Sequence, residues 1–453
     1  MTIWQPTIPR GQGPVYRALA DALERAVESG VLTAGSRLPP HRALARALGV
    51  TVMTVTRAYR DAARRGLVEA TVGRGSFVRR PGAEPARRET AVVDLAANVI
   101  QGPVAADPGP ALTAAIAAGL ADAAYRAPAG SERHRAAGAA WLARSGLRVR
   151  PEQVLVTVGA QHGLFVALAS QTKPGDVVLA EHLTYHGLHA IARLLHLELR
   201  GVRLDRGGLD PDDLERQARR ARARVLVCVP TFQNPTGTVM SVQRRREVVE
   251  VARRRDLTLV EDDVYGFLLP APPPPLAALA PERTLHLTGT SKSLSPALRV
   301  GYLVAPEERR EALATLIGAS VWGVSAPAAE IAASWIERGV ATRVVAHKRA
   351  LVAVRQRAAR RALQGLRSAS HPASPHLWVE LPARWPAEAL VAAAAARSVR
   401  LLGAATFWLG RERPPGAVRV CLGAAADAAT LESALVRVHA LAARAPADPA
   451  PIV

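Results

Sequence analysis

The chain has 453 residues, 49% of them hydrophobic, and a formal net charge of +21. This length suffices for a small and a large domain with a substantial core, and the charge suits a polyanionic partner. The two cysteines, Cys228 and Cys421, lie in apolar runs, which excludes a disulfide framework, and no signal peptide or membrane-length apolar run is present. We therefore expect a cytoplasmic protein.

The first eighty residues carry thirteen arginines against five acidic residues, a net charge of +8. Apolar residues at helical spacing over 15–27 predict a first helix that stops at Gly30. Residues 41–48, which end at Gly49, predict a second helix. Thr51 is placed to cap a third helix over about 52–64, and two short strands, 67–72 and 76–78, follow around a glycine-flanked turn.

Three helices followed by a glycine-turned hairpin predict a winged helix-turn-helix domain. A basic helix face is often only a solvated face, but the order of the elements and the capped third helix favour contact with double-stranded DNA. The residues that we expect at the DNA are Arg42, Thr51, Thr54, Thr56, Arg57 and, at the tip of the wing, Arg74. Residues 81–93 lack apolar periodicity and contain proline, so we expect a linker between a domain of residues 1–80 and one of residues 94–453.

Four apolar runs in the second part predict buried strands; three of them lead into polar residues and the fourth contains one. The run 225–229 leads to Asn234 in an Asn-Pro-Thr-Gly turn, and the run 257–260 delivers Asp262 and Tyr265. The run 285–287 is followed by Lys292, and Arg419 interrupts the late apolar run 418–422. Because ligands of parallel α/β sheets bind at the carboxyl ends of the strands, these side chains are expected to meet there.

Lys292 stands out because the chain almost avoids lysine: only three of its 59 basic residues are lysines. Arginine serves as well for surface charge, but guanidinium stays protonated and cannot condense with a carbonyl. Lys292 is therefore predicted to be a Schiff-base lysine, with Arg299 seven residues later beside a phosphate site. A carboxylate such as Asp262 can hold a protonated pyridine nitrogen, and Arg419 can clamp a carboxylate.

From about residue 94 to 440 the chain resembles the fold-type I pyridoxal-phosphate enzymes of the aspartate aminotransferase class. The resemblance implies that Lys292 is the catalytic lysine that forms the internal aldimine, that Asp262 meets the pyridinium, and that Arg419 binds a substrate or effector carboxylate. The other residues that it implies at the cofactor or effector are Asn234 and Tyr265 at the phenolic oxygen, Arg299, Gly159, Ala160, Gln161, Thr290 and Ser291 at the phosphate, Tyr185 stacked on the ring, and Tyr125 reaching the phosphate across a dimer interface.

The first segment resembles the DNA-binding domain of the GntR superfamily, and the whole arrangement resembles the MocR subfamily of bacterial transcriptional regulators. This resemblance implies a homodimer that binds operator DNA and pyridoxal 5'-phosphate and senses an amino compound by aldimine exchange. The alternative is a working aminotransferase with an accessory DNA-binding domain. His182, His186 and His189 lack a further ligand at suitable spacing, so no metal site is predicted.

Overall fold

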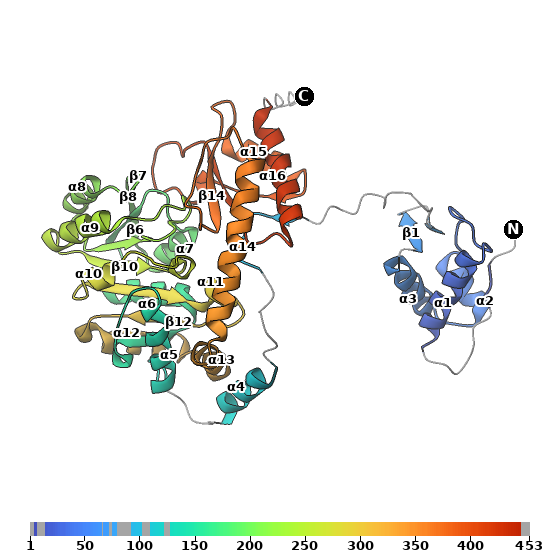
Figure 1. The fold of residues 1–453 in the computed structure, drawn as a ribbon, viewed down its shortest axis with the longest axis horizontal. Helices are drawn as coiled ribbons and strands as arrows, with labels where there is room; N and C mark the ends of the chain where they lie inside the picture. The colour runs from blue at the N-terminus through green and yellow to red at the C-terminus, as the bar shows by residue number, and fades with distance from the viewer. Residues whose placement is uncertain are drawn as a thin grey trace. The chain divides into compact units, whose positions relative to one another are not determined.

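The computed structural model describes residues 4–6, 14–65, 67–71, 75–78, 92–101, 109–121 and 127–444. The chain forms two compact units, Met1–Ala91 and Val92–Val453, which are described separately (Figure 1). The first unit contains three helices, α1 (Val15–Glu28), α2 (His41–Leu48) and α3 (Val52–Arg64), and an antiparallel pair of strands, β1 (Val68–Thr71) and β2 (Gly75–Val78). The predicted winged helix-turn-helix fold is therefore confirmed.

Helix ends in this unit follow from the residues that cap them. Gly49 adopts a left-handed φ of 64° after α2, a conformation that favours glycine, and the Thr51 hydroxyl accepts a hydrogen bond from the Thr54 amide at the start of α3 over 3.1 Å. The apolar faces of the three helices form one core around Leu19, Leu44 and other buried side chains. Val15, at the start of the predicted apolar pattern, lies outside this core.

The second unit is built on a seven-stranded sheet with helices on both faces (Figure 1). Its order is β4 (Val154–Thr157), β12 (Gly301–Val304), β11 (Thr284–Gly289), β10 (Thr258–Asp262), β9 (Val225–Cys228), β5 (Val177–Glu181) and β6 (Glu198–Val202). Strand β12 runs antiparallel to both neighbours, and the other neighbouring pairs are parallel. The central strands β9, β10 and β11 are buried throughout, which explains their continuous apolar runs.

Helices of this unit precede, connect and follow these strands. They are α4 (Gly109–Ala121), α5 (Glu132–Ala143), α6 (Gly159–Gln171), α7 (His186–Leu194), α8 (Pro211–Ala221), α9 (Val242–Arg254), α10 (Leu276–Leu279), α11 (Thr290–Ser293), α12 (Arg310–Val321), α13 (Ala326–Glu337) and α14 (Val340–Ala362). The 23-residue helix α14 runs from the region of α11 towards the C-terminal part of the unit, where it packs on α16 (Ala428–Ala443) (Figure 1). It therefore connects the large sheet with the C-terminal part.

The C-terminal part contains a four-stranded antiparallel sheet of order β13 (Ser368–Ala369), β14 (His376–Glu380), β17 (Ala417–Cys421) and β16 (Leu402–Gly403), with α15 (Ala387–Ala395) and α16 packed against it. Strand β3 (Val93–Asp94) pairs with β15 (Val399–Arg400). The segment that follows the expected linker is thus attached to this C-terminal part, although it lies some 300 residues away in sequence.

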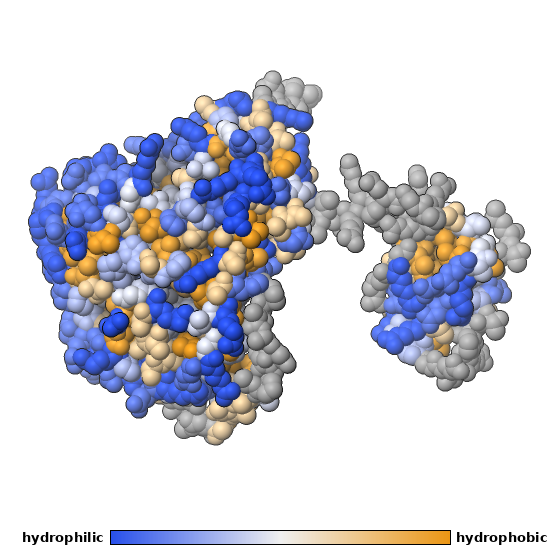
Figure 2. Space-filling view, viewed as in Figure 1, coloured by the Kyte–Doolittle hydropathy of each residue, from blue (hydrophilic) through white to orange (hydrophobic). Residues whose placement is uncertain are grey.

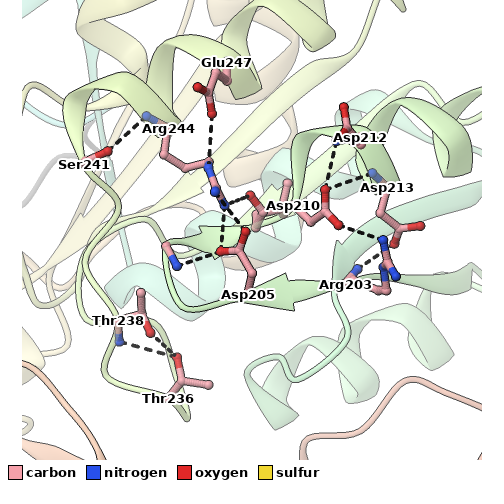
Figure 3. Close-up of polar contacts among 12 residues, drawn as sticks. Arg203, Asp205, Asp210, Asp212, Asp213, Thr236, Thr238, Ser241, Arg244 and Glu247 are labelled. Atoms are coloured by element: carbon pink, nitrogen blue, oxygen red, sulfur yellow. Dashed lines mark hydrogen bonds and ion pairs between the residues drawn. The ribbon is translucent and has the colours of Figure 1, made fainter.

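The glycine-containing segment 201–208 has a structural role. It includes the hairpin β7 (Leu204–Asp205) and β8 (Gly208–Leu209), and both guanidinium nitrogens Nη1 and Nη2 of Arg244 on α9 donate to the Asp205 carboxylate over 2.9 Å (Figure 3). Asp210 accepts hydrogen bonds from the Asp212 and Asp213 amides and so caps α8. These contacts give structural roles to Asp205 in this segment and to Asp210 just after it.

Hydrophilic residues cover most of the visible surface of each unit, with scattered apolar patches between them (Figure 2). Within the described ranges, no helix is both long and apolar enough to cross a membrane.

Candidate functional site

One pocket of about 490 Å³ lies at the carboxyl ends of the central strands. Asn234 follows β9, Asp262 ends β10, and Lys292 lies on α11 directly after β11, so three neighbouring strands deliver one functional side chain each. Of the residues predicted from the sequence, the pocket wall contains Ala160, Gln161, Tyr185, Asn234, Asp262, Tyr265, Ser291, Lys292, Arg299 and Arg419. Residues far apart in the chain therefore surround one cavity.

Four further predicted residues are placed differently. Gly159 begins α6 next to the pocket wall, with a left-handed φ of 75°, and a Cβ there would lie 3.6 Å from the Arg299 guanidinium. Thr290 is buried behind the wall, where its hydroxyl donates to the Val300 carbonyl over 2.9 Å. Tyr125 and Arg74 lie outside the described residues.

Lys292 is largely enclosed, and its Nζ donates a hydrogen bond to the Asn98 carbonyl oxygen over 2.5 Å. Burial lowers the pKa of this amine, and the nearby positive charges of Arg419 and Arg299 act in the same direction. A lowered pKa raises the fraction of free amine, which is the form that can attack a carbonyl.

Asp262 is a buried carboxylate whose Oδ1 has no hydrogen-bond partner among the described residues. Burial raises the pKa of this carboxyl to about 7, and the negative charge of neighbouring Asp263 adds to the shift. Such a group gains most from a cationic N–H donor in the pocket, because that partner offsets the cost of burying the charge.

Arg419 is almost completely buried on β17. Its Nη1 donates to Asn234 Oδ1 over 2.7 Å, its Nη2 donates to the Ala96 carbonyl over 2.6 Å, and its Nε has no partner. In the described part of the chain it has no ion pair with a carboxylate, although a buried cation is costly unless it is paired. The guanidinium therefore suits an anionic ligand.

Several residues of the wall escaped the sequence-based prediction. Asp94, Ala96, Ala97, Asn98 and Val99 enter from the segment after the expected linker, and Arg400 and Leu402 enter near β15 and β16. No motif marks the first group, because only its pairing with β15 and β17 brings it to the pocket. His186, considered above only as a metal ligand, also lines the wall.

The predicted DNA-contacting residues of the first unit differ in the contacts that they make with other residues of this unit. Arg42 and Arg57 are exposed, and the Arg57 guanidinium lies 4.4 Å from the centre of the Tyr16 ring. The hydroxyls of Thr51 and Thr54 lie 2.8 Å apart at the start of α3. Thr56 donates to the Val52 carbonyl and lies 3.0 Å from His41 Nδ1, so its hydroxyl helps to hold α2 against α3.

Comparison with known proteins matches each unit to a family. Residues 15–78 match the bacterial regulatory proteins of the gntR family, and residues 90–438 match the aminotransferase class I and II family. The chain is a MocR-type member of the GntR superfamily. It is 30% identical to the pyridoxine biosynthesis transcriptional regulator PdxR of Corynebacterium glutamicum over 88% of this chain and 90% of that regulator.

Other relatives share this MocR-type organisation or its larger part. The uncharacterized regulator YdeF of Bacillus subtilis is 28% identical over 96% of this chain and 95% of its own length. The crystal structure of LysN, an α-aminoadipate aminotransferase of Thermus thermophilus, is 25% identical, covers 78% of this chain and 92% of its own, and superposes with a TM-score of 0.70. The chain is thus a transcriptional regulator with an aminotransferase-like body, and the cofactor of that body is pyridoxal 5'-phosphate.

The pocket of this MocR-type chain fits that cofactor. The unpartnered Asp262 Oδ1 supplies an acceptor for a pyridinium N–H, and the start of α6 with Arg299 supplies donors for a phosphate. Lys292 brings a primary amine of lowered pKa into the same wall.

Proposed function

We propose that this regulator binds operator DNA through the winged helix and senses an amino compound with an α-carboxylate in the pocket. The observation that carries the proposal is the buried Arg419 guanidinium, which lines the same cavity as Lys292 and lacks a carboxylate partner among the described residues. A small molecule that carries both an amine and a carboxylate suits these two side chains.

The residues proposed to hold the cofactor have distinct tasks. Asp262 accepts from the ring nitrogen, and Asn234 and Tyr265 hold the phenolic oxygen. Arg299 holds the phosphate; the other residues proposed there are Gly159, Ala160, Gln161, Thr290, Ser291 and, beyond the described residues, Tyr125. Tyr185 covers the ring and is steadied by the 3.1 Å hydrogen bond from its hydroxyl to Gln161 Oε1.

When bound, the cofactor supplies an aldehyde carbon that condenses reversibly with a primary amine. The role of Lys292 is to offer its amine in unprotonated form and to yield its place to the amine of the ligand. Arg419 orients that ligand by a paired hydrogen bond to its carboxylate, a geometry that a planar guanidinium provides and that lysine does not. Its bond to Asn234 Oδ1 fixes that amide, which leaves the Asn234 NH₂ group free to donate to the phenolic oxygen.

The signal is proposed to leave the pocket through residues 92–101, the segment that directly follows the linker. Ala96 O accepts from Arg419, Asn98 O accepts from Lys292, and the backbone of the segment pairs with residues 398, 400, 421 and 423 of the C-terminal part. A ligand carboxylate competes with Ala96 O for Arg419, so ligand binding and the position of this segment are coupled. Only a ligand that prefers one arrangement of the segment can shift DNA affinity.

On the DNA side, we propose that α3 enters the major groove, with Thr54 and Arg57 at base edges and Arg42, Thr51 and Arg74 at the backbone. Thr56 was also expected at the DNA, and its proposed part is to hold α2 and α3 in register through His41 and Val52. Because its target is the chromosome, we propose a cytoplasmic location.

A homodimer is also proposed. Helix α4 exposes 69% of Leu120 and 37% of Ile116, and Trp322 at the end of α12 is 56% exposed. Exposed apolar side chains that gather in a patch mark surfaces for contact with another protein. Light scattering of the parent and of Leu120→Glu tests this proposal, because a charge in a subunit interface shifts the mass towards the monomer.

The second candidate function is a working aminotransferase, and the ten predicted residues that line the pocket, Lys292 among them, favour it. The two functions are separated by titrating amino acids and other amines into the cofactor-loaded protein while following its visible absorbance, its affinity for DNA and the yield of carbonyl product. A sensor gives a spectral change and a change in DNA affinity with at most one product per site. An enzyme gives many turnovers.

A further inference from the structure

A buried chain of hydrogen bonds runs from the pocket into the C-terminal sheet. Asn98 Nδ2 lies 2.8 Å from the Tyr265 hydroxyl and 3.0 Å from His376 Nδ1. His376 Nε2 in turn lies 3.0 Å from the backbone carbonyl oxygen of Gln233. Tyr265 and Asn98 line the pocket, whereas His376, at the start of β14, is fully buried and lies outside its wall. Three segments that are distant in sequence therefore meet behind the Tyr265 hydroxyl.

The direction of each hydrogen bond in this chain follows from its far end. A carbonyl oxygen only accepts, so His376 Nε2 carries the hydrogen that is donated to Gln233. Burial lowers the pKa of His376 to about 3, with the positive charge of Arg419 acting in the same direction, so the imidazole is neutral at physiological pH. A neutral imidazole with its hydrogen on Nε2 accepts at Nδ1, and Asn98 Nδ2 is therefore the donor to it.

Asn98 Nδ2 carries two hydrogens, and it donates the second one to the Tyr265 oxygen. Tyr265 consequently accepts from Asn98 and cannot also direct its own hydrogen there. The described residues contain no other side-chain partner for this hydroxyl, which lies at the pocket wall. Its hydrogen is left to point into the pocket.

The far end of the chain is fixed in place. The Gln233 side chain donates to the Leu183 carbonyl over 2.6 Å and accepts from the Thr236 amide and hydroxyl over 3.0 and 2.8 Å. The charged groups that act on His376 are Arg419, on the adjacent strand β17, and Lys292, and both favour its neutral form. The Gln233 backbone carbonyl at Nε2 and the Asn98 amide at Nδ1 hold this neutral imidazole in one tautomer.

We propose that His376 and Asn98 are positioning residues that set the direction of the Tyr265 hydroxyl, so that this hydroxyl donates to the phenolic oxygen of the cofactor. The inference rests on the proposed function, which places that oxygen beside Tyr265. His376 acts at a distance, through the Asn98 amide. If the acceptor at His376 is lost, the amide is free to turn and present its oxygen to Tyr265, whose hydrogen then points away from the cofactor.

The test compares His376→Leu with His376→Gln in the full-length protein loaded with pyridoxal 5'-phosphate. Leucine removes both the donor and the acceptor, whereas glutamine restores one of each. The measured quantity is the pH midpoint of the visible absorbance change. A hydrogen bond donated to a phenolic oxygen stabilises the deprotonated form, so its loss raises the midpoint, by about one to two pH units for a bond to a charged group.

Tyr265→Phe gives the full effect of losing this hydroxyl, and Tyr302→Phe, a buried tyrosine outside the pocket, is the matched control. We expect His376→Leu to raise the midpoint in the direction of Tyr265→Phe, and His376→Gln and Tyr302→Phe to keep that of the parent. In the Tyr265→Phe background, His376→Leu is expected to have no further effect, because it acts only through the missing hydroxyl.

An unchanged midpoint in His376→Leu overturns the inference, and so does a shift that persists in the Tyr265→Phe background, since that shift reaches the cofactor by another route. An unchanged midpoint in Tyr265→Phe itself contradicts the proposed place of the cofactor and the inference with it. If His376→Leu fails to bind the cofactor, Asn98→Asp decides in the same two backgrounds, because a carboxylate accepts from Tyr265 but cannot donate to it.

Discussion

The Lys348 ammonium donates hydrogen bonds to the backbone carbonyls of Lys292 and Leu294, each over 2.9 Å. The chain has three lysines, and two of them are joined in this way at the pocket. Lys348 is buried on α14, so the long helix that connects the large sheet with the C-terminal part also holds the turn that carries Lys292.

Replacing Lys348 with methionine leaves these two carbonyls without a donor, and we expect a loss of about 1–3 kcal/mol in the free energy of unfolding. Burial lowers the pKa of Lys348 to about 8, below that of an unfolded lysine, and the charge of Lys292 adds to the shift. Between pH 8 and about 10.5 the unfolded state binds more protons at this site, so its contribution to stability rises with pH. Denaturant titrations at several pH values should show this rise in the parent and a smaller one in Lys348→Met.

Lys292→Ala is expected to abolish the visible absorbance that arises when the cofactor is joined covalently to the protein. Lys292→Arg should fail equally, because guanidinium supplies no free amine. Lys173→Ala is the matched control, since Lys173 is an exposed lysine that does not line the pocket. A parent-like spectrum in Lys292→Ala would place the attachment at another residue.

The sequence alone predicted the strands that carry Asn234, Asp262 and Lys292, because buried parallel strands are continuous apolar runs and polar residues at their ends are conspicuous. It also predicted the helix cap at Thr51, a contact between neighbours in the chain. Both kinds of signal are local.

The parts that escaped prediction depend on contacts between distant segments. Asn98 and His376 are 278 residues apart, and nothing near either residue indicates that they share a hydrogen bond. In the sequence, Lys348 is one basic residue among several in a basic segment, and no local pattern indicates that it donates to two backbone carbonyls. Likewise, the tether of residues 92–101 to the pocket arises from strand pairing with the C-terminal part, which no local pattern encodes.

DNA binding is expected to weaken steeply as salt concentration rises, because contacts to phosphates release counterions. Thr54→Ala and Arg57→Ala should weaken binding to the operator by about 1–3 kcal/mol if each side chain reads a base edge. Arg74→Ala, at the predicted wing tip, should lower affinity with little change in sequence preference. Arg25→Ala controls for the loss of one charge, since Arg25 is exposed on α1 rather than α3. If the Thr54, Arg57 and Arg74 variants bind like the parent, the recognition surface lies elsewhere.

Arg419→Leu tests the coupling between the two functions. The variant keeps Lys292, so it should keep the visible absorbance of the bound cofactor, and its DNA-binding unit is unaltered. It loses the clamp for a ligand carboxylate, and the effector-induced change in DNA affinity, typically about 1–3 kcal/mol for coupled sites, should disappear. Arg419→Lys should recover only part of it, because an ammonium cannot form the paired bond. Titrating the effector against a labelled operator fragment, with parent and variants side by side, measures this response. A parent-like response in Arg419→Leu would mean that the effector has no carboxylate at this position or that sensing runs through another site.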